Sequence, residues 1–321
     1  MMKWSIGCDG GGTYTRAVLV DNSGVVQGVS RGGSGNFQRI GEEGLLALLD
    51  RLLAPLLDLS GKERVSLGLA LAGAGRSVEQ ERIETLVKEW GWKGTVHVES
   101  DARAALEGAH AGAPGLIAIA GTGSIVMGKN DRNESVRAGG WGPILGDEGS
   151  GYYLGLEALQ AAARKLDGIG PATGLVDALA AELGLGTWDR LVPEVYGGRI
   201  DHRQIAALGP LVTAVAREGD QVALEIIERA GVALGAQVVA VAERLGLTGD
   251  VGLCCMGGVF AERGLLDSAL QRAVSTRMDL ELRSPLLPAV LGAVLLAWRR
   301  EGREPDGRLL KRLRAFNPES L

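Results

Sequence analysis

The sequence has few aromatic residues and no excess of basic charge. Phe, Trp and Tyr together make up 4% of its 321 residues, and the formal net charge is -5. Proteins that bind single-stranded nucleic acid stack its bases on aromatic side chains, and proteins that bind phosphate backbones carry a surplus of Lys and Arg. The composition therefore predicts no nucleic-acid partner.

Cysteine is also scarce. Cys8, Cys254 and Cys255 are too few and too unevenly placed for a disulfide framework. No C-x-x-C pair is present to hold zinc or an iron–sulfur cluster. A reducing cytoplasm is the compartment that this cysteine usage predicts.

No segment has the pattern of a membrane span or a signal peptide. The longest uncharged apolar run, residues 285–298, is shorter than the ~20 residues that cross a bilayer and contains two prolines, so it predicts a buried helix. The N-terminus leads directly into an expected strand and a glycine turn, without the apolar stretch of a signal peptide.

Glycine, in contrast, is abundant, with 50 residues, and it marks a repeated pattern. Residues 3–21 predict a strand, a glycine turn and a second strand, and residues 116–129 predict the same hairpin around the turn at 121–124. The chain is therefore predicted to be a duplicated α/β unit. Because single cores stop growing near ~250–300 residues, we expect two lobes with a cleft between them.

The remaining elements follow from hydrophobic periodicity. Further strands are predicted over residues 65–71, 95–100 and 251–256. Helices are predicted over residues 42–57, 78–90, 151–165, 174–183, 204–217 and 220–245, with others beginning at Asp101 and after Gly258.

The first glycine turn has the composition of a phosphate cradle. Gly11, Gly12 and Thr13 offer main-chain N–H groups that no large side chain covers, and Thr13 adds a hydroxyl. A plain hairpin turn is the alternative. Asp9 favours the cradle, because a carboxylate beside phosphates is repulsive unless a divalent cation lies between them. The pair therefore implies Mg²⁺. No Walker loop is present, and the turn leads into a strand rather than the helix of a dinucleotide site.

The second turn offers a similar set of donors without an acid. Thr122, Gly123 and Ser124 supply main-chain N–H groups and two hydroxyls. Paired with the first turn, it suggests that a phosphate chain is held from both lobes.

A third glycine motif follows the strand expected over residues 251–256. Gly257 and Gly258 would let adenine or ribose approach the backbone closely, or would simply form a tight connection between the strand and the next helix.

Asp101 stands where an expected strand meets an expected helix. Ligand clefts of open α/β sheets lie at the carboxyl ends of strands, so Asp101 is a candidate general base that accepts a hydroxyl proton during attack on a γ-phosphate. The alternative is that Asp101 is a helix N-cap.

The loop at 139–155 has the features of a sugar pocket. Gly140, Trp141 and Asp147 lie in a glycine-rich stretch, where an indole can face a sugar ring and a carboxylate can bind its hydroxyls. A capped helix start, with acidic residues favoured by the helix dipole, is the alternative. Asn36 is either a turn residue or a polar contact for a ligand.

Taken together, these segments resemble one family. They are DGGGTYTRAVLVD at 9–21, ESDARAALEGA at 99–109, AGTGSI at 120–125, GGWGPILGDEGSGYYLG at 139–155 and MGGVF at 256–260. Their order resembles the BadF/BadG/BcrA/BcrD group of the actin-like ATPase superfamily, in particular its N-acetylglucosamine kinase branch. The resemblance implies a duplicated ribonuclease-H-like fold with ATP in the interlobe cleft. The first lobe would comprise residues 1–118 with about 285–321, and the second residues 119–284.

The resemblance also implies roles for single residues. Asp101 would be the base on the sugar 6-hydroxyl, and Asp9 would hold Mg²⁺ through water. ATP phosphates would bind to Gly11, Gly12, Thr13, Thr122, Gly123 and Ser124, and adenosine to Gly257 and Gly258. The sugar, N-acetylglucosamine or a related amino sugar or hexose, would contact Asn36, Gly140, Trp141 and Asp147 as well as Asp101. Pro143, Ile144 and Leu145 fill the part of the sugar loop where relatives vary.

Two other functions are open at this stage. One is an activator-type ATPase of the same family, although Cys8, Cys254 and Cys255 fit cluster ligation poorly. The other is a sugar sensor without turnover, although the sequence begins at the first strand with no basic DNA-binding helix. A homodimer is expected, because dimers are the commonest arrangement of soluble enzymes.

Overall fold

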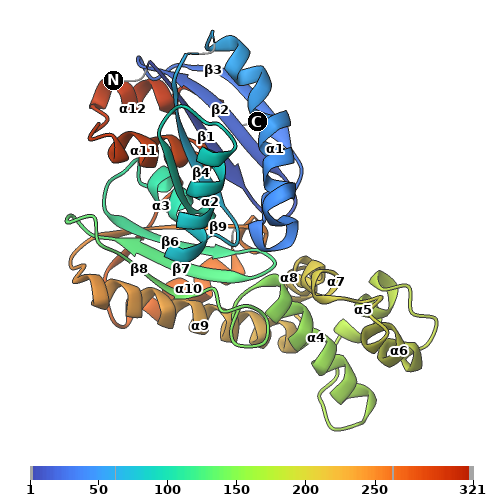
Figure 1. The fold of residues 1–321 in the computed structure, drawn as a ribbon. Helices are drawn as coiled ribbons and strands as arrows, with labels where there is room; N and C mark the ends of the chain where they lie inside the picture. The colour runs from blue at the N-terminus through green and yellow to red at the C-terminus, as the bar shows by residue number, and fades with distance from the viewer. Residues whose placement is uncertain (1–2, 62, 262–263, 318–321) are drawn as a thin grey trace. The chain divides into compact units, whose positions relative to one another are not determined.

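The computed structural model describes residues 3–61, 63–261 and 264–317, and it divides the chain into two compact units. Unit 1 combines Met1–Pro114 with Ser284–Leu321, and unit 2 is Gly115–Arg283. The outermost residues of the expected first lobe, 1–2 and 318–321, and residues 262–263 of the expected second lobe lie outside the described residues. In Figure 1, blue and red segments therefore share unit 1, although they are the two ends of the chain.

Unit 1 contains a five-stranded sheet in the order β3-β2-β1-β4-β5. The strands are β1 (Trp4–Gly10), β2 (Thr15–Asp21), β3 (Val26–Gly32), β4 (Val65–Leu71) and β5 (Val96–Ser100). β1 pairs antiparallel with β2, which confirms the predicted hairpin, and parallel with β4, which pairs parallel with β5. The carboxyl ends of β1, β4 and β5 therefore meet at one edge of the sheet.

Helices cover both faces of this sheet. Leucines of α1 (Phe37–Leu59) and apolar residues of α2 (Ser77–Glu89) form one core with the strands. On the other face lie α3 (Asp101–Ala109) and α11 (Ala289–Arg300), followed by α12 (Gly307–Arg314). The apolar run at 285–298 supplies most of α11, whose residues Val290 to Trp298 are all buried, so the prediction of a buried helix is confirmed.

Glycine sets the distance between α11 and the sheet. A Cβ on Gly68 of β4 would lie 2.1 Å from the carbonyl oxygen of Ala293, and a Cβ on Gly7 of β1 would lie 2.3 Å from that of Val290. Contacts under 3.0 Å to main-chain atoms leave no room for any other residue. The helix therefore packs directly on the backbone of the central strands.

Unit 2 repeats this sheet topology. Its order is β10-β9-β6-β7-β8, with β6-β7-β8 antiparallel and β6-β9-β10 parallel. The strands are β6 (Gly115–Ala120), β7 (Ser124–Lys129), β8 (Ser135–Gly139), β9 (Val251–Met256) and β10 (Leu280–Leu282). Since the order and the directions are those of the sheet in unit 1, the predicted duplication is confirmed.

The rest of unit 2 is helical, as predicted. The helices are α4 (Gly151–Leu166), α5 (Leu175–Glu182), α6 (Leu191–Tyr196), α7 (His202–Ala207), α8 (Gly209–Arg217), α9 (Gln221–Leu245) and α10 (Leu265–Ser275). The single helix predicted over 204–217 is wrong. Pro210 lies in the first turn of α8, where its missing N–H is harmless, whereas inside one long helix it would break the hydrogen-bond ladder. Among the described helices, none is long and apolar enough to cross a membrane.

Candidate active site

Asp101 is the first residue of α3, directly after β5 ends at the carboxyl edge of the sheet. Ser100 is the N-cap, and its side chain accepts a hydrogen bond from the main-chain N–H of Arg103 at 3.1 Å. The alternative that Asp101 caps the helix is therefore wrong. The Asp101 carboxylate accepts the adjacent N–H of Ala102, at 2.8 Å, and interacts with its own main-chain N–H. Burial raises the pKa of Asp101.

Asp9 lies near the end of β1, in the same unit. Burial, and to a smaller extent the negative charge of Asp101, raise the pKa of Asp9 to about 6, and Arg16 opposes both effects. Two carboxylates that interact in this way form an acidic site that favours a cation. The structure thus brings together two residues that lie 92 positions apart in the sequence.

The first glycine turn is held by the loop before α1. The N–H of Gly11 donates to the carbonyl oxygen of Tyr14 at 3.0 Å, and the carbonyl oxygen of Gly11 accepts from the N–H of Gly35 at 2.9 Å. A Cβ on Gly35 would lie 2.6 Å from Gly10 Cα, so the two glycine loops are in direct contact. Gly12 and Thr13 are exposed at the tip.

Asn36 follows Gly35 in the sequence and directly precedes α1. Its side chain accepts from the main-chain N–H of Arg39 at 3.3 Å, so Asn36 is the N-cap of the helix. The Arg39 guanidinium in turn donates to the carbonyl oxygen of Gly12 at 3.4 Å. Asn36 therefore caps the helix whose first turn contacts the first glycine turn through Arg39.

In unit 2, the second turn and the predicted sugar loop form one hydrogen-bonded assembly. The N–H groups of Gly151 and Gly140 donate to the carbonyl oxygens of Gly121 and Ser124, at 2.8 and 2.9 Å. The N–H of Tyr152 donates to the carbonyl oxygen of Thr122 at 3.3 Å. Thr122 itself is exposed.

Asp147 lies against this turn and also interacts with the main chain of Gly142, the residue after Trp141. Its Oδ1 accepts from the N–H of Ser124 at 3.2 Å, and the side chain is 6% exposed. Burial raises the pKa of Asp147, and the N–H of Ser124 lowers it. The Ser124 hydroxyl donates to the carbonyl oxygen of Glu148 at 2.7 Å. Both donors of Ser124 are thus engaged by the sugar loop in this structure.

Trp141 is 62% exposed, with the Arg137 guanidinium 5.1 Å from its ring centre. Gly140, before it, has a φ of 69°, which a side chain would strain. Ile144 and Leu145, farther along the loop, are also exposed. The loop therefore presents an indole face and two aliphatic side chains at its surface.

Gly257 and Gly258 connect β9 to a short 3₁₀ turn, Gly258–Phe260. Gly257 has a φ of 101°, and a Cβ there would lie 2.3 Å from the carbonyl oxygen of Ala120. The structure thus places this pair directly against the residue before the second glycine turn. Nothing lies within 4 Å of a Cβ on Gly258.

Two basic residues near the first glycine turn were not singled out from the sequence. Arg16 is opposite Asp9 in the hairpin register, and its guanidinium lies 4.6 Å from the ring centre of Tyr14. The register counted from the turn could have revealed Arg16. Arg39 could not be found in this way, because its contact with Gly12 depends on the path of the loop at 33–36.

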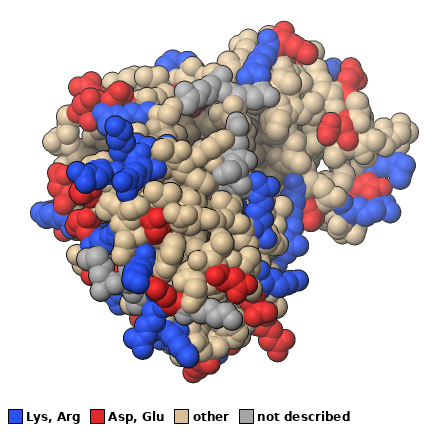
Figure 2. Space-filling view, turned by 90° about the horizontal axis from the view of Figure 1, so that it is seen from above, with Lys and Arg blue, Asp and Glu red and all other residues tan. Residues whose placement is uncertain are grey.

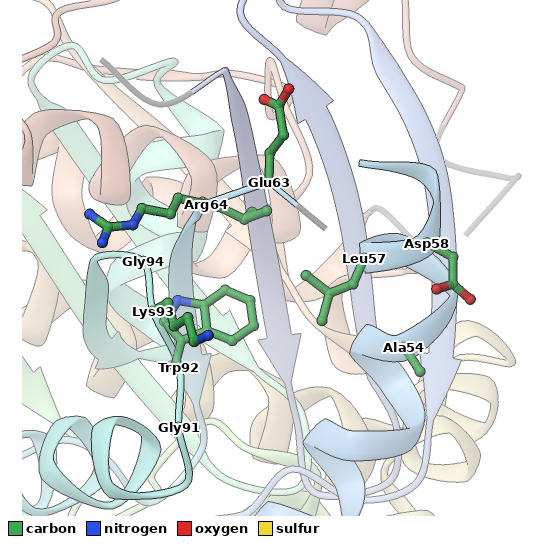
Figure 3. A pocket seen from close by; sticks show the side chains of 10 residues that line it. Ala54, Leu57, Asp58, Glu63, Arg64, Gly91, Trp92, Lys93 and Gly94 are labelled. Atoms are coloured by element: carbon green, nitrogen blue, oxygen red, sulfur yellow. The ribbon is translucent and has the colours of Figure 1, made fainter. Parts of the chain in front are cut away.

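Elsewhere in unit 1, a groove of about 390 Å³ lies at the opposite end of β4 from Asp101, beside Val65. Figure 3 shows the Trp92 ring facing Leu57 across it, while the charged groups of Arg64 and Asp58 point away. None of the predicted site residues lines this groove.

On the face shown in Figure 2, basic and acidic side chains are interspersed, which is unlike the continuous basic surface of a protein that binds phosphate backbones. Within residues 3–61, 63–261 and 264–317, no group of three or more His, Cys, Asp or Glu side chains could hold a metal ion.

A family model described as the BadF/BadG/BcrA/BcrD ATPase family matches residues 6–297. The chain is 32% identical to N-acetylmuramic acid/N-acetylglucosamine kinase of Clostridium acetobutylicum, over 92% of this chain and 98% of that protein. It is 31% identical to N-acetyl-D-glucosamine kinase of Dictyostelium discoideum, over 91% of this chain and 97% of that protein.

Among solved structures, one match is a protein from Chromobacterium violaceum provisionally named N-acetylglucosamine kinase. The TM-score is 0.74 at 27% sequence identity, and the match covers 92% of this chain and 99% of that chain.

Proposed function

The chain belongs to the BadF/BadG/BcrA/BcrD ATPase family, and from this premise we propose that it is an ATP-dependent kinase that phosphorylates the 6-hydroxyl of N-acetylglucosamine or a related amino sugar. Its fold is the duplicated ribonuclease-H-like fold of the actin-like ATPases. The observation that carries the proposal is that two kinases named for amino sugars match more than nine-tenths of the chain at over 30% identity.

In this proposal Asp101 is the general base. Its carboxylate accepts the proton of the sugar hydroxyl as that oxygen bonds to the γ-phosphorus, while the bond from the γ-phosphorus to the bridging oxygen breaks and ADP leaves. The position of Asp101 at the carboxyl edge of the sheet supports this role, as does its release from helix capping by Ser100. Its raised pKa makes it a stronger base than an exposed aspartate.

The residues of unit 1 also fit a magnesium ion. The mutual repulsion of Asp9 and Asp101 leaves an acidic site that a cation would stabilise. Mg²⁺ keeps several waters and binds through one or two carboxylates together with substrate phosphates, so it needs no cluster of three protein ligands. Asp9 would hold it, through water, and the ion would neutralise charge on the transferred phosphoryl group.

The other predicted site residues take the roles that the resemblance implies. We assign the ATP phosphates to the two glycine turns, through Gly11, Gly12, Thr13, Thr122, Gly123 and Ser124. Gly257 and Gly258 would contact adenosine. Asn36, Gly140, Trp141 and Asp147 would contact the sugar, with the exposed indole of Trp141 against its ring. We further propose a cytoplasmic homodimer. The scarcity of cysteine, with Cys8, Cys254 and Cys255 too few and too unevenly placed for a disulfide framework, supports the compartment.

A coupled assay of ADP release across a sugar panel tests the proposal. The panel contains N-acetylglucosamine, N-acetylmuramic acid, glucosamine, N-acetylmannosamine and glucose, each with Mg²⁺ and ATP. We expect ADP release that depends on at least one N-acetylated amino sugar. If no sugar stimulates ADP release although ATP still binds, a sugar sensor without turnover becomes the better assignment.

A further inference from the structure

The carboxylate of Asp147 occupies the second glycine turn. Its Oδ1 accepts the N–H of Ser124 at 3.2 Å. A Cβ on Gly123 would lie 2.8 Å from Oδ2 and 3.0 Å from Cγ and Oδ1, so the whole carboxylate lies on the face of Gly123. Main-chain N–H groups in a glycine turn attract anions. Asp147 is thus an internal anion at a site whose donors suit a phosphate.

The backbone at Asp147 is held in an unusual conformation. Its φ is 64°, in the left-handed region that non-glycine residues seldom adopt. The N–H of Ser150 donates to the carbonyl oxygen of Asp147 at 3.1 Å, and the Ser124 hydroxyl holds Glu148 through its carbonyl oxygen. A strained residue that is over-determined by its neighbours is typical of a functional switch.

The same contacts join the sugar loop to the turn. The N–H groups of Gly140, Gly151 and Tyr152 all donate to carbonyl oxygens of the turn, at 2.9, 2.8 and 3.3 Å. Asp147 lies between these contacts in the sequence. A change in the partner of the Asp147 carboxylate would therefore alter the conformation of both the second glycine turn and the sugar loop, which lie in the same unit.

We propose that Asp147 and the phosphates of the nucleotide compete for the N–H of Ser124, so that Asp147 weakens nucleotide binding until sugar engages its carboxylate. This inference rests on the proposed function, because it takes the turn as a phosphate site and Asp147 as a sugar ligand. A carboxylate and a phosphate are both anions and cannot share one N–H donor. Sugar hydroxyls that donate to Asp147 replace the Ser124 N–H and free it for phosphate.

The consequence is a positive coupling between sugar and nucleotide. Coupling factors between two sites are typically about 5–150-fold in affinity, and the effect is reciprocal. The wild-type protein should therefore bind ADP with Mg²⁺ at least about fivefold more tightly when N-acetylglucosamine is saturating. Such coupling would also limit ATP hydrolysis in the absence of sugar.

The decisive variant is Asp147→Asn, measured without sugar. Asparagine keeps an acceptor for Ser124 and removes the negative charge. Calorimetric titration should show ADP with Mg²⁺ binding to the variant about fivefold or more tightly than to the wild type. Adenosine has no phosphate, so its affinity should not change. Glu148→Gln is the matched control, because it removes an equal charge one residue away without touching the Ser124 N–H, and its effect on ADP should stay below about twofold.

The outcomes separate the inference from the proposed function. Tighter ADP binding by Asp147→Asn, with unchanged adenosine binding, supports competition at Ser124. Equal or weaker ADP binding by a variant with wild-type thermal stability overturns the inference while leaving the kinase assignment intact. If the wild type binds neither ADP nor ATP and no sugar is phosphorylated, the proposed function fails and the inference fails with it.

Discussion

Ser100 caps the helix that Asp101 begins. The Ser100 hydroxyl oxygen accepts the N–H of Arg103 at 3.1 Å, so the Asp101 carboxylate is not needed to satisfy the helix terminus. This strand-to-helix junction has two consecutive polar residues, so Ser100 satisfies the helix terminus and the Asp101 carboxylate is available for its proposed role as general base.

Asp101→Asn should therefore damage turnover without damaging the fold. We expect turnover with an amino sugar to fall by about two to four orders of magnitude, the usual size of a general-base contribution. The dissociation constants of ATP and sugar, measured by titration, should stay close to those of the wild type. Ser100→Ala is the control, since loss of the cap should lower the free energy of unfolding by about 1 kcal/mol. Unchanged turnover in Asp101→Asn would remove Asp101 from the mechanism.

Asp9 should destabilise the protein at neutral pH. Its pKa in the folded state is about 6, raised mainly by burial, against an ordinary value of 3.8 in an unfolded chain. Between these values the folded state binds more protons than the unfolded state, so the free energy of unfolding falls as the pH rises through this window. Above about pH 6 the penalty is fully present. Asp9→Asn should then raise the free energy of unfolding by about 1–3 kcal/mol at pH 7.5, without metal or nucleotide.

The pH dependence supplies the check on Asp9. In urea titrations, the gain from Asp9→Asn should shrink as the pH approaches 4. Asp21 is a control of opposite sign, because four hydrogen bonds from Ser23, Val25 and Gln27 lower its pKa. Asp21→Asn should destabilise the protein at pH 7.5. A variant Asp9→Asn that is less stable than the wild type at pH 7.5 contradicts this account.

Gly68→Ala should destabilise unit 1 through its packing against α11. The added Cβ would lie 2.1 Å from the carbonyl oxygen of Ala293, and neither main chain can yield without moving a buried helix. Overpacking of this kind costs about 1–3 kcal/mol or more, and we expect a lower midpoint in thermal unfolding. Gly33→Ala is the control, since nothing lies within 4 Å of its Cβ. Equal midpoints for the two variants would show that α11 can shift freely.

Glu107 should be the most sensitive charged residue of α3. Its fully buried carboxylate binds Arg103 at 2.9 Å and Arg299 of α11 at 2.5 Å. Glu107→Gln removes the buried carboxylate that Arg103 and Arg299 share, while Arg299 keeps its pair with Glu304 at 3.4 Å. Breaking a buried pair typically costs about 3–5 kcal/mol. Glu63 forms an exposed pair with Lys3 at 3.0 Å, so Glu63→Gln should cost under about 1 kcal/mol. Chemical unfolding of both variants measures the difference, and similar losses would argue against a special role for Glu107.

Much of the fold could be predicted because the strands next to the glycine turns are strongly patterned. β1, β2, β6 and β7 are nearly continuous buried runs, so their hairpins and the duplication were visible in the sequence. The edge strands β3 and β8 were not expected, because their residues are mostly half-buried and show no clear alternation. The break between α7 and α8 was missed because Pro210 is equally compatible with the first turn of a helix.

The site could be predicted only in part, for a similar reason. The position of Asp101 could be predicted because a junction between a strand and a helix is a local sequence pattern. The contact of Asp147 with Ser124 spans 23 residues and depends on a left-handed backbone at Asp147, which no sequence rule indicates. The direct packing of Gly35 on Gly10 likewise depends on the path of a loop rather than on composition.

The central claim is that the chain transfers the γ-phosphoryl group of ATP to the 6-hydroxyl of an amino sugar. Phosphorus–proton correlation NMR of the reaction product with N-acetylglucosamine tests it most directly. The account predicts one new phosphorus signal coupled to the two protons on carbon 6, formed in equal amount to ADP. A signal coupled to the proton on carbon 1, or inorganic phosphate alone beside the ADP, would contradict it.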